Sequence, residues 1–275
     1  MNTEKLQMLK EKATAIRLGV LEETHAAKSG HPGGSMSISD LLAYLYFDHM
    51  NIDPANPKDE NRDRLVLSKG HCAPALYAAL AERGYFDKAL LSTLRQHDSI
   101  LQGHPDMKHI PGVDMSTGSL GLGISAACGM AISAKASGDA YRVYTILGDG
   151  ESEEGQVWEA AMFAAHYKLD NLCAFIDWNG LQIDGKVTDV MNPTPLDEKF
   201  KAFGWNVIVI DAHDFDQIEA ACKAARACKG KPTAVICKSV KGKGVSFMEN
   251  QVGWHGKAPS KEQYETAVAE LSASV

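Results

Sequence analysis

The sequence lacks the features of a membrane-bound, secreted or nucleic-acid-binding chain. Its 275 residues contain no run of about eighteen apolar residues, the length that a membrane span needs. The first fifteen residues mix charged and apolar types and hold no short apolar core of a signal peptide. The 28 Lys and Arg form no basic stripe and are outnumbered by 35 Asp and Glu, which gives a net charge of −7. We therefore expect a soluble, cytoplasmic protein that binds neither nucleic acid nor membranes.

Cysteine motifs are also missing. None of the six cysteines belongs to a C-x-x-C pair, and Ala, Ile, Val or Leu lies beside each of them. This pattern predicts reduced thiols in the core, not a disulfide framework or a zinc site. A catalytic thiol at Cys72, next to His71, is the alternative at this point.

Composition and length predict a folded protein with a full core. Hydrophobic residues make up 45% and charged residues 23%, which is usual for soluble globular proteins and excludes a disordered chain. At roughly 150 residues per domain, the length allows between one and two domains.

The first part of the chain is predicted to be mainly helical. Apolar residues at helical spacing indicate helices at Thr3–Lys28 and at about Ser37–His49. Arg64–Ser68 is short and apolar enough for a buried strand. The next helix, His71–Arg83, is expected to end at Gly84, a residue type that commonly terminates helices.

The rest of the chain predicts the fold class. After a functional loop expected at His97–Gly118 and a buried helix expected at Leu120–Gly138, strands and helices alternate. The strands are Arg142–Leu147, Leu172–Asp177, Val207–Asp211 and Thr233–Lys238, and the helices are Glu153–Lys168, Pro195–Gly204, Phe215–Lys229 and Ser260–Ser272. Continuous apolar strands separated by helices are typical of parallel sheets. We therefore predict an α/β fold, a doubly wound, mainly parallel sheet with helices on both faces, whose ligands bind beyond the carboxyl ends of the strands.

Unusual residues follow two of these strands. Gly148-Asp149-Gly150 comes directly after one strand, and Asn179 follows Asp149 by 30 positions, after the next strand. Adjacent parallel strands would bring these two side chains to one edge of the sheet. Carboxylate and amide oxygens with a backbone carbonyl suit Mg²⁺. The alternative is that Gly-Asp-Gly is only a turn.

Six segments together resemble the transketolase family. They occur in the family's order and are Ser29–Gly33, Ser68–His71, Gly103–Pro105, Ser116–Gly121, Gly148–Gly155 and Trp254–Gly256. The resemblance covers only the N-terminal, diphosphate-binding part of a transketolase. It implies one diphosphate-binding domain at residues 1–275 with an N-terminal helical extension, the thiamine-diphosphate-binding fold, and no pyrimidine-binding or C-terminal domain.

The resemblance also implies a metal and cofactor site. Asp149, Asn179 and the carbonyl of Leu181 would hold Mg²⁺, or another divalent cation such as Ca²⁺ or Mn²⁺, which in turn grips the diphosphate of thiamine diphosphate. Gly150 and the Gly118-Ser119-Leu120 turn would contact this cofactor through backbone atoms.

Four histidines and a lysine complete the implied site. His71 and His255 would reach the diphosphate and, together with His31 and His104, surround the reacting hydroxyls of the sugar. Imidazoles suit these proton transfers because they titrate near neutral pH. Lys241 matches a lysine close to the cofactor in mammalian-type members, and a solvated loop is the alternative for it.

Two acids match residues at the family's dimer interface. Glu154 and Glu159 would couple the two active sites there, which makes Glu154 a candidate for a catalytic and cofactor-binding role. Acids are favoured at helix N-termini whatever the function, so a purely structural role for Glu154 is the alternative.

The implied activity is transfer of a two-carbon ketol unit from a ketose phosphate to an aldose phosphate, as in the pentose phosphate pathway. Breaking a bond beside a carbonyl leaves a carbanion that no side chain stabilises, so the cofactor must act as the electron sink. The glutamate that activates the cofactor and the residues that bind the sugar phosphate would come from a separately encoded C-terminal transketolase subunit. We expect an α2β2 assembly that is active only with that subunit.

Four other functions are open at this stage. The same chemistry could act on an unusual sugar phosphate such as a branched pentulose phosphate. The α subunit of a 2-oxo acid dehydrogenase or a deoxyxylulose-phosphate synthase shares the Gly-Asp-Gly and Asn pair, although neither should carry all the histidine segments. A cofactor-binding remnant without catalysis would have lost the metal pair or the histidines, which are all present. A nicotinamide-dependent dehydrogenase needs a G-x-G-x-x-G turn after a strand, which the sequence lacks.

Overall fold

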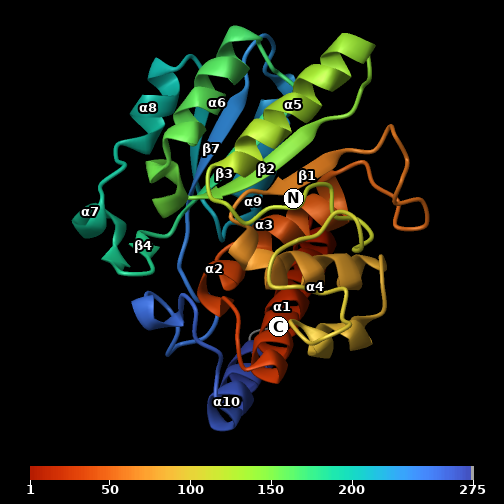
Figure 1. Ribbon diagram of the computed structural model, residues 1–275, viewed down its shortest axis with the longest axis vertical. Helices are drawn as coiled ribbons and strands as arrows, with labels where there is room; N and C mark the ends of the chain where they lie inside the picture. The colour runs from red at the N-terminus through yellow and green to blue at the C-terminus, as the bar shows by residue number, and fades with distance from the viewer. Residues whose placement is uncertain (274–275) are drawn as a thin grey trace.

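A five-stranded parallel sheet lies at the centre of the computed structural model, which describes residues 1–273 (Figure 1). The strand order is β1-β2-β3-β7-β6, and every neighbouring pair is parallel. The strands are β1 (Arg64–Leu67), β2 (Val143–Gly148), β3 (Leu172–Trp178), β6 (Asn206–Asp211) and β7 (Thr233–Lys238). The predicted parallel sheet is confirmed.

Helices cover both faces of the sheet, as the α/β prediction requires (Figure 1). One face packs against α1 (Thr3–Ala27), α3 (Ser39–Tyr44), α4 (Ala73–Arg83) and α9 (Phe215–Ala227). The other face packs against α5 (Leu122–Ser137), α6 (Gly155–His166) and α8 (Leu196–Ala202). Successive side chains of β2 point to opposite faces of the sheet and so belong to two hydrophobic cores. Tyr144 and Ile146 pack in the core on the first face, and Val143 and Leu147 in the core on the second.

Short elements connect these layers. They are α2 (Pro32–Met36), a π-helix (Leu45–His49), α7 (Val187–Val190), the two-stranded hairpin β4 (Leu181–Gln182) and β5 (Gly185–Lys186), and 3₁₀ turns at Gly70–Cys72, Lys88–Thr93, Gly150–Glu153 and Val252–Trp254. The last helix, α10 (Lys261–Ser272), lies beside α1 (Figure 1). Its Ser260 cap accepts from Gln263 N, and the Gln263 side chain accepts from Ser260 N in return.

The single helix predicted at Ser37–His49 is wrong. The chain is already helical from Pro32, breaks at Ile38 (φ −102°, ψ 4°) and ends in the π-helix. Ser37 Oγ lies 2.8 Å from Asp177 Oδ2, so the residue before the break is tied to the end of β3. Serine hydroxyls that bond outside the helical ladder weaken it, which explains the break.

The helix expected to be buried at Leu120–Gly138 is only half-buried. α5 presses closely on the residue that follows β1, because a Cβ on Gly123 would lie 2.5 Å from Ser68 Cα. Its other side carries the exposed Leu122 and Gly129, which no described part of the chain covers. The expectation failed because a small-residue helix can pack on one face alone.

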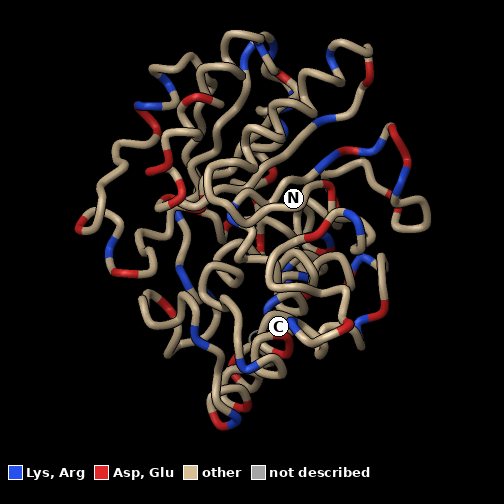
Figure 2. Tube along the Cα trace, in the orientation of Figure 1, with Lys and Arg blue, Asp and Glu red and all other residues tan. Residues whose placement is uncertain are grey.

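Lys and Arg (blue) and Asp and Glu (red) are interspersed along the trace (Figure 2). No helix within residues 1–273 is both long and apolar enough to cross a membrane. All six cysteines are unpaired, and five of them are buried.

Candidate active site

The ends of β2 and β3 bring Asp149 and Asn179 together, as the parallel pairing predicted. Gly148 stands opposite Asp177 in the register of the two strands. Beyond them, Asp149 Oδ2 accepts a hydrogen bond from Gly180 N at 2.6 Å, and its Oδ1 accepts from Gly150 N at 2.9 Å. The Asp149 side chain therefore lies across the turn that follows Asn179.

The amide of Asn179 has one defined orientation. Its Nδ2 donates to Asp177 Oδ2 at 2.9 Å, and its Oδ1 accepts from Leu181 N at 3.1 Å. A carboxylate only accepts and a backbone N–H only donates, so the amide cannot be reversed without losing both bonds. The carbonyl oxygen of Asn179 is thereby kept on the Leu181 side, and the nitrogen faces the interior.

Asp177 is the buried centre of this arrangement. Its Oδ2 lies 2.6 Å from Lys69 Nζ, and Ser239 Oγ donates to its Oδ1. Burial alone would raise the pKa of the Asp177 carboxyl, but Lys69 and the hydrogen bonds lower it. The carboxylate is therefore ionised, and Lys69 also reaches the carbonyl of Gly34 at 2.9 Å.

Lys241 is buried, so the solvated loop considered for it is wrong. Only 2% of the residue is exposed, and its Nζ donates to Leu181 O at 3.0 Å and lies 3.1 Å from His255 Nδ1. Burial, followed by the nearby charge of Lys69, lowers the pKa of the Lys241 ammonium. The carbonyl of Leu181, which the resemblance assigns to the metal, thus contacts Lys241, and a carbonyl oxygen has two lone pairs and can accept from more than one partner.

Three of the predicted histidines form a compact cluster. The ring centres of His31, His71 and His255 are 5.1 to 5.4 Å apart. Burial is the main cause that lowers the pKa of His31 and His71 to about 4 and of His255 to about 3, with neighbouring cations adding to it. At neutral pH all three rings are uncharged and can accept or donate a proton.

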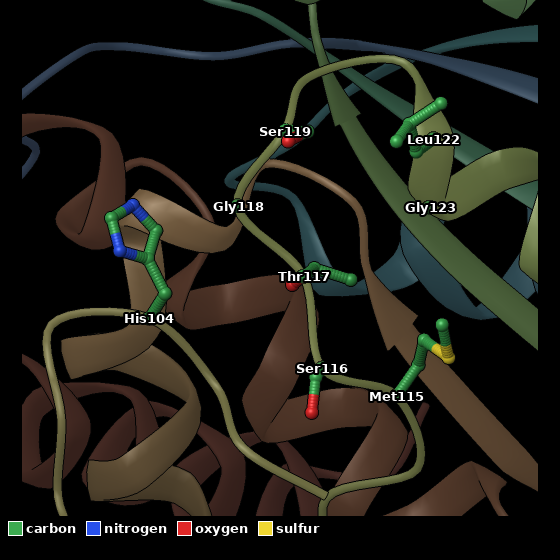
Figure 3. A pocket seen from close by; sticks show the side chains of 8 residues that line it. All are labelled: His104, Met115, Ser116, Thr117, Gly118, Ser119, Leu122 and Gly123. Carbon is green, nitrogen blue, oxygen red and sulfur yellow. The ribbon is translucent and has the colours of Figure 1, made fainter.

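His104 stands at the edge of this cluster, on an exposed loop. Tyr77 Oη lies 2.9 Å from the carbonyls of Gln102 and His104 and holds the loop to α4. In Figure 3 the segment through Thr117 and Gly118 runs between the His104 ring on one side and the Leu122 side chain on the other. A Cβ on Gly118 would lie 3.3 Å from His104 Cδ2, so glycine allows the close approach.

A pocket of about 390 Å³ joins most of the predicted site residues. It is lined by His31, His71, His104, His255, Gly118, Leu120, Asp149, Gly150, Asn179, Leu181 and Lys241. Ser119 lines a neighbouring cavity of about 520 Å³ instead, together with Thr117 and Leu122 (Figure 3).

The two predicted interface acids lie outside this pocket. Glu154 is exposed at the start of α6, and its Cβ packs against Gly121. Glu159 is exposed one turn further and lines a shallow groove between α5 and α6 with Phe163.

Four pocket side chains were not identified from the sequence. Lys69 and Glu151 had a signal, because each is a charged residue beside a buried strand at the ligand end of the sheet. Glu151 is 3% exposed and accepts from Ser68 Oγ, Gly121 N and Gly148 N, so it braces the turns around the pocket. Gln182 and Ile183 had no signal in the sequence, because the residues of the short β4–β5 hairpin do not show the alternation typical of a strand.

Comparisons with known proteins agree with this fold and site. The sequence model for "Transketolase, thiamine diphosphate binding domain" matches residues 8–272. The chain is 49% identical to the 6-deoxy-6-sulfo-D-fructose transketolase subunit SqwG of Clostridium sp. (strain MSTE9), over 96% of each chain. It is 42% identical to an apulose-4-phosphate transketolase subunit of Phocaeicola vulgatus, over 99% of this chain and 95% of that one.

Longer transketolases match over part of their length. Human transketolase is 42% identical over 99% of this chain, which corresponds to 43% of the human protein. The crystal structure of transketolase from Campylobacter jejuni superposes with a TM-score of 0.92 at 33% identity, covering 99% of this chain and 43% of that one.

The fold and the pocket thus define an α/β domain that gathers oxygen ligands, a lysine and histidines at the carboxyl end of a parallel sheet. The chain belongs to the transketolase family and comprises its thiamine diphosphate-binding domain. Its relatives are enzymes named as transketolases, and two of them are named as transketolase subunits of about this length.

Proposed function

We propose that this chain is the N-terminal subunit of a split transketolase, that residues 1–275 act as one diphosphate-binding domain, and that it transfers a two-carbon ketol unit between sugar phosphates. The observation that carries the proposal is the pocket that joins the Asp149 and Asn179 turns to four histidines and Lys241. The alternative thiamine diphosphate enzymes are less well supported, because the named relatives are transketolases.

The donor set fits a hard cation that carries a diphosphate. Asp149, Asn179 and the Leu181 carbonyl would hold Mg²⁺, or Ca²⁺ or Mn²⁺ in its place, through oxygen atoms alone. Within residues 1–273 no group of three or more His, Cys, Asp or Glu is arranged to hold a metal. The proposed site therefore needs the amide oxygen of Asn179 and the carbonyl oxygen of Leu181 in addition to the Asp149 carboxylate. Thiamine diphosphate supplies the electron sink for the carbanion when it is bound.

The backbone and Lys241 would bind the diphosphate end. Gly150 and the Gly118-Ser119-Leu120 turn would contact the cofactor through backbone atoms; Gly150, Gly118 and Leu120 line the pocket, which supports this assignment. The buried Lys241 ammonium adds a positive charge in a setting that water screens poorly.

The histidines would move the protons of the reaction. His31, His71 and His255 are neutral at pH 7, so one ring nitrogen of each can accept a proton from a sugar hydroxyl. His104 completes the set from its loop, where burial also lowers its pKa.

A second chain would complete the site. The outward faces of α5 and α6 expose Leu122, Met162 and Phe163, with 52%, 58% and 38% of each residue accessible. Glu159 lines a groove with Phe163, and Glu154 lies against Gly121, next to Leu122, which supports their assignment to a subunit interface. We assign this face to an α2β2 assembly with a separately encoded C-terminal transketolase subunit, which would contribute the activating glutamate and the residues that bind the sugar phosphate.

The proposed donor is a ketose that carries an anionic end, which fits the pentose phosphate type of reaction. The two subunit relatives are named for 6-deoxy-6-sulfo-D-fructose and for apulose-4-phosphate. A cytoplasmic location is proposed because all six cysteines are unpaired, as is usual in reducing compartments, and cell fractionation with an antibody to the chain tests it.

The experiment is a ketol-transfer assay with the purified chain alone and with the C-terminal subunit encoded in the same genome. Xylulose 5-phosphate, apulose 4-phosphate and 6-deoxy-6-sulfofructose serve as donors, with ribose 5-phosphate as acceptor. We expect turnover only when both chains are present. Full activity of the lone chain would refute the split architecture, and inactivity of the complex with every donor would refute the proposed activity.

A further inference from the structure

A further histidine lies directly behind the site, outside the pocket. His213 belongs to the turn between β6 and α9, and its ring bridges two elements that are far apart in the sequence. Its Nδ1 lies 2.7 Å from Asp40 Oδ2 on α3, and its Nε2 lies 2.9 Å from the backbone nitrogen of Val240. The imidazole therefore links the first layer of helices to the segment that follows β7.

These contacts determine the protonation state of the ring. A backbone N–H only donates, so Nε2 of His213 must carry a lone pair and accept from Val240. The hydrogen then resides on Nδ1 and is donated to the carboxylate of Asp40. This geometry exists only for the neutral imidazole, because a doubly protonated ring would turn a donor toward the Val240 N–H.

Asp40 is held in turn by Arg17 of α1. The two guanidinium nitrogens of Arg17 lie 3.0 and 2.5 Å from the two Asp40 oxygens, and both residues are buried. Burial would raise the pKa of the Asp40 carboxyl, but Arg17 and His213 outweigh it and lower that pKa to about 2. Asp40 is therefore a fixed acceptor for Nδ1–H.

Val240, at the other end of these contacts, lies between two residues that contact the active site. Ser239 bonds to Asp177 through its hydroxyl, and Lys241 reaches Leu181 O and His255.

The peptide unit after Lys241 is also fixed. Gly242 N donates to Gly33 O at 2.9 Å. Gly242 has φ +77°, and a Cβ there would lie 2.5 Å from Met248 O, so the turn has little freedom to readjust.

We infer that Arg17, Asp40 and neutral His213 form a positioning relay that fixes the Val240 amide and thereby places the Lys241 ammonium in the pocket. His213 contacts no pocket residue other than through this amide in the described structure, so it is a positioning residue and not a catalytic one. The assignment of a ligand to Lys241 rests on the proposed function, whereas the relay itself rests on the contacts of this chain alone.

The test compares three variants of the full chain. His213→Ala removes the acceptor, and His213→Gln can return one, because its side-chain oxygen can reach the position of Nε2. His25→Gln is the matched control, since His25 is also half-buried and contacts the carbonyl of Pro259 far from Val240. Hydrogen exchange of the peptide that contains residues 239–244 is measured by mass spectrometry at neutral pH and corrected for intrinsic rates.

We expect His213→Ala to lower the protection of residues 239–244 about tenfold, with recovery of most of it in His213→Gln and no change in His25→Gln. Equal protection in His213→Ala and the unmodified chain would overturn the relay.

The role of the relay is tested in the complex with the C-terminal subunit. Affinity for thiamine diphosphate in the presence of Mg²⁺ should fall at least about tenfold in His213→Ala and recover in His213→Gln. If exchange responds but affinity does not, the placing of Lys241 is wrong although the relay exists. If the unmodified complex binds no cofactor at all, the proposed function fails while the exchange result still stands.

Discussion

Lys69 Nζ lies 2.6 Å from Asp177 Oδ2 at the end of β3, and only 2% of either side chain is exposed. Asp177 also accepts from the Asn179 amide and from the hydroxyls of Ser37 and Ser239. One ion pair thus joins α2, the ends of β3 and β7 and the turn before α4. It also selects which atom of Asn179 faces the proposed metal site.

Removal of one partner of this pair should be costly for stability. Lys69→Met leaves a buried carboxylate without its cation, and we expect it to lower the free energy of unfolding by about 3 kcal/mol. The double variant Lys69→Met with Asp177→Asn should lose less than the sum of the two single variants, because it leaves no unpaired charge. Urea unfolding of the four proteins measures this coupling.

The control for this experiment is Lys88→Met. Lys88 pairs with Glu82 at the surface with 59% of its side chain exposed, so its loss should cost less than about 1 kcal/mol. Strictly additive effects at Lys69 and Asp177 would show that the pair does not act as a unit.

Replacement of Lys241 should separate binding from stability. Lys241→Met removes the buried ammonium whose pKa is lowered by burial, so the free energy of unfolding should be unchanged or rise by about 1 kcal/mol. The same change should weaken thiamine diphosphate binding by about tenfold or more, because a poorly screened positive charge is lost. Calorimetric titration of the two-subunit complex measures the affinity.

Lys238→Met is the matched control for Lys241. Lys238 lies three residues earlier, is exposed and stands over the Trp178 ring at 6.0 Å. Its replacement should leave affinity unchanged, and an equal loss in both variants would indicate a general charge effect rather than a contact by Lys241.

The histidine cluster should make the stability of the free chain depend on pH. The ordinary histidine pKa is 6.5, and in the folded chain it is about 4 for His31 and His71 and about 3 for His255. The unfolded chain therefore takes up protons first, so the stabilising contribution is present above pH 6.5 and is lost as the pH falls toward 4. Replacement of all three by Gln should flatten the fall of the melting temperature between pH 6.5 and 4.5.

The measured quantity is the difference between the unmodified chain and the triple variant in how the melting temperature depends on pH. Burial raises the pKa of the Glu23 carboxyl, which has the opposite dependence on pH but is common to both chains. His166→Gln, at an exposed position of α6, serves as the control and should retain the original slope. Parallel pH curves for the unmodified chain and the triple variant would contradict the burial of neutral imidazoles.

Tyr77 should act on the reaction through the loop that carries His104. Tyr77→Phe removes the hydroxyl that lies 2.9 Å from the carbonyls of Gln102 and His104, and it should cost about 1 kcal/mol in stability. We expect kcat/KM of the complex to fall severalfold with cofactor affinity unchanged. The control is Tyr85→Phe, just beyond the C-terminal end of α4, which should change neither stability nor kcat/KM. Unchanged kinetics in Tyr77→Phe would show that the loop carrying His104 does not need the Tyr77 hydroxyl.

The sheet and the meeting of Asp149 with Asn179 were predictable because they follow from local pattern and general geometry. Apolar strands separated by helices make a parallel sheet, and the ends of neighbouring strands then share an edge. The break at Ile38 was not predictable, because it depends on Ser37 meeting Asp177, which is distant in sequence.

The histidine cluster shows the same limit. His31, His71 and His255 come from three segments far apart in the sequence, and no spacing in the sequence indicates that their ring centres lie within 5.4 Å of one another. Only the resemblance to a family placed them together. The role of His213 was missed because it acts through long-range contacts that leave no local pattern. Lys69 was missed although its place after a buried strand was a signal, because its partner Asp177 is distant in sequence.

The most direct test of the central claim is calorimetric titration of thiamine diphosphate with Mg²⁺ into the two-subunit complex, with the unmodified chain and with Asp149→Ala. Circular dichroism must first show that both complexes are folded alike. The account predicts uptake by the unmodified complex and none by Asp149→Ala. Equal affinity in the two complexes would contradict it.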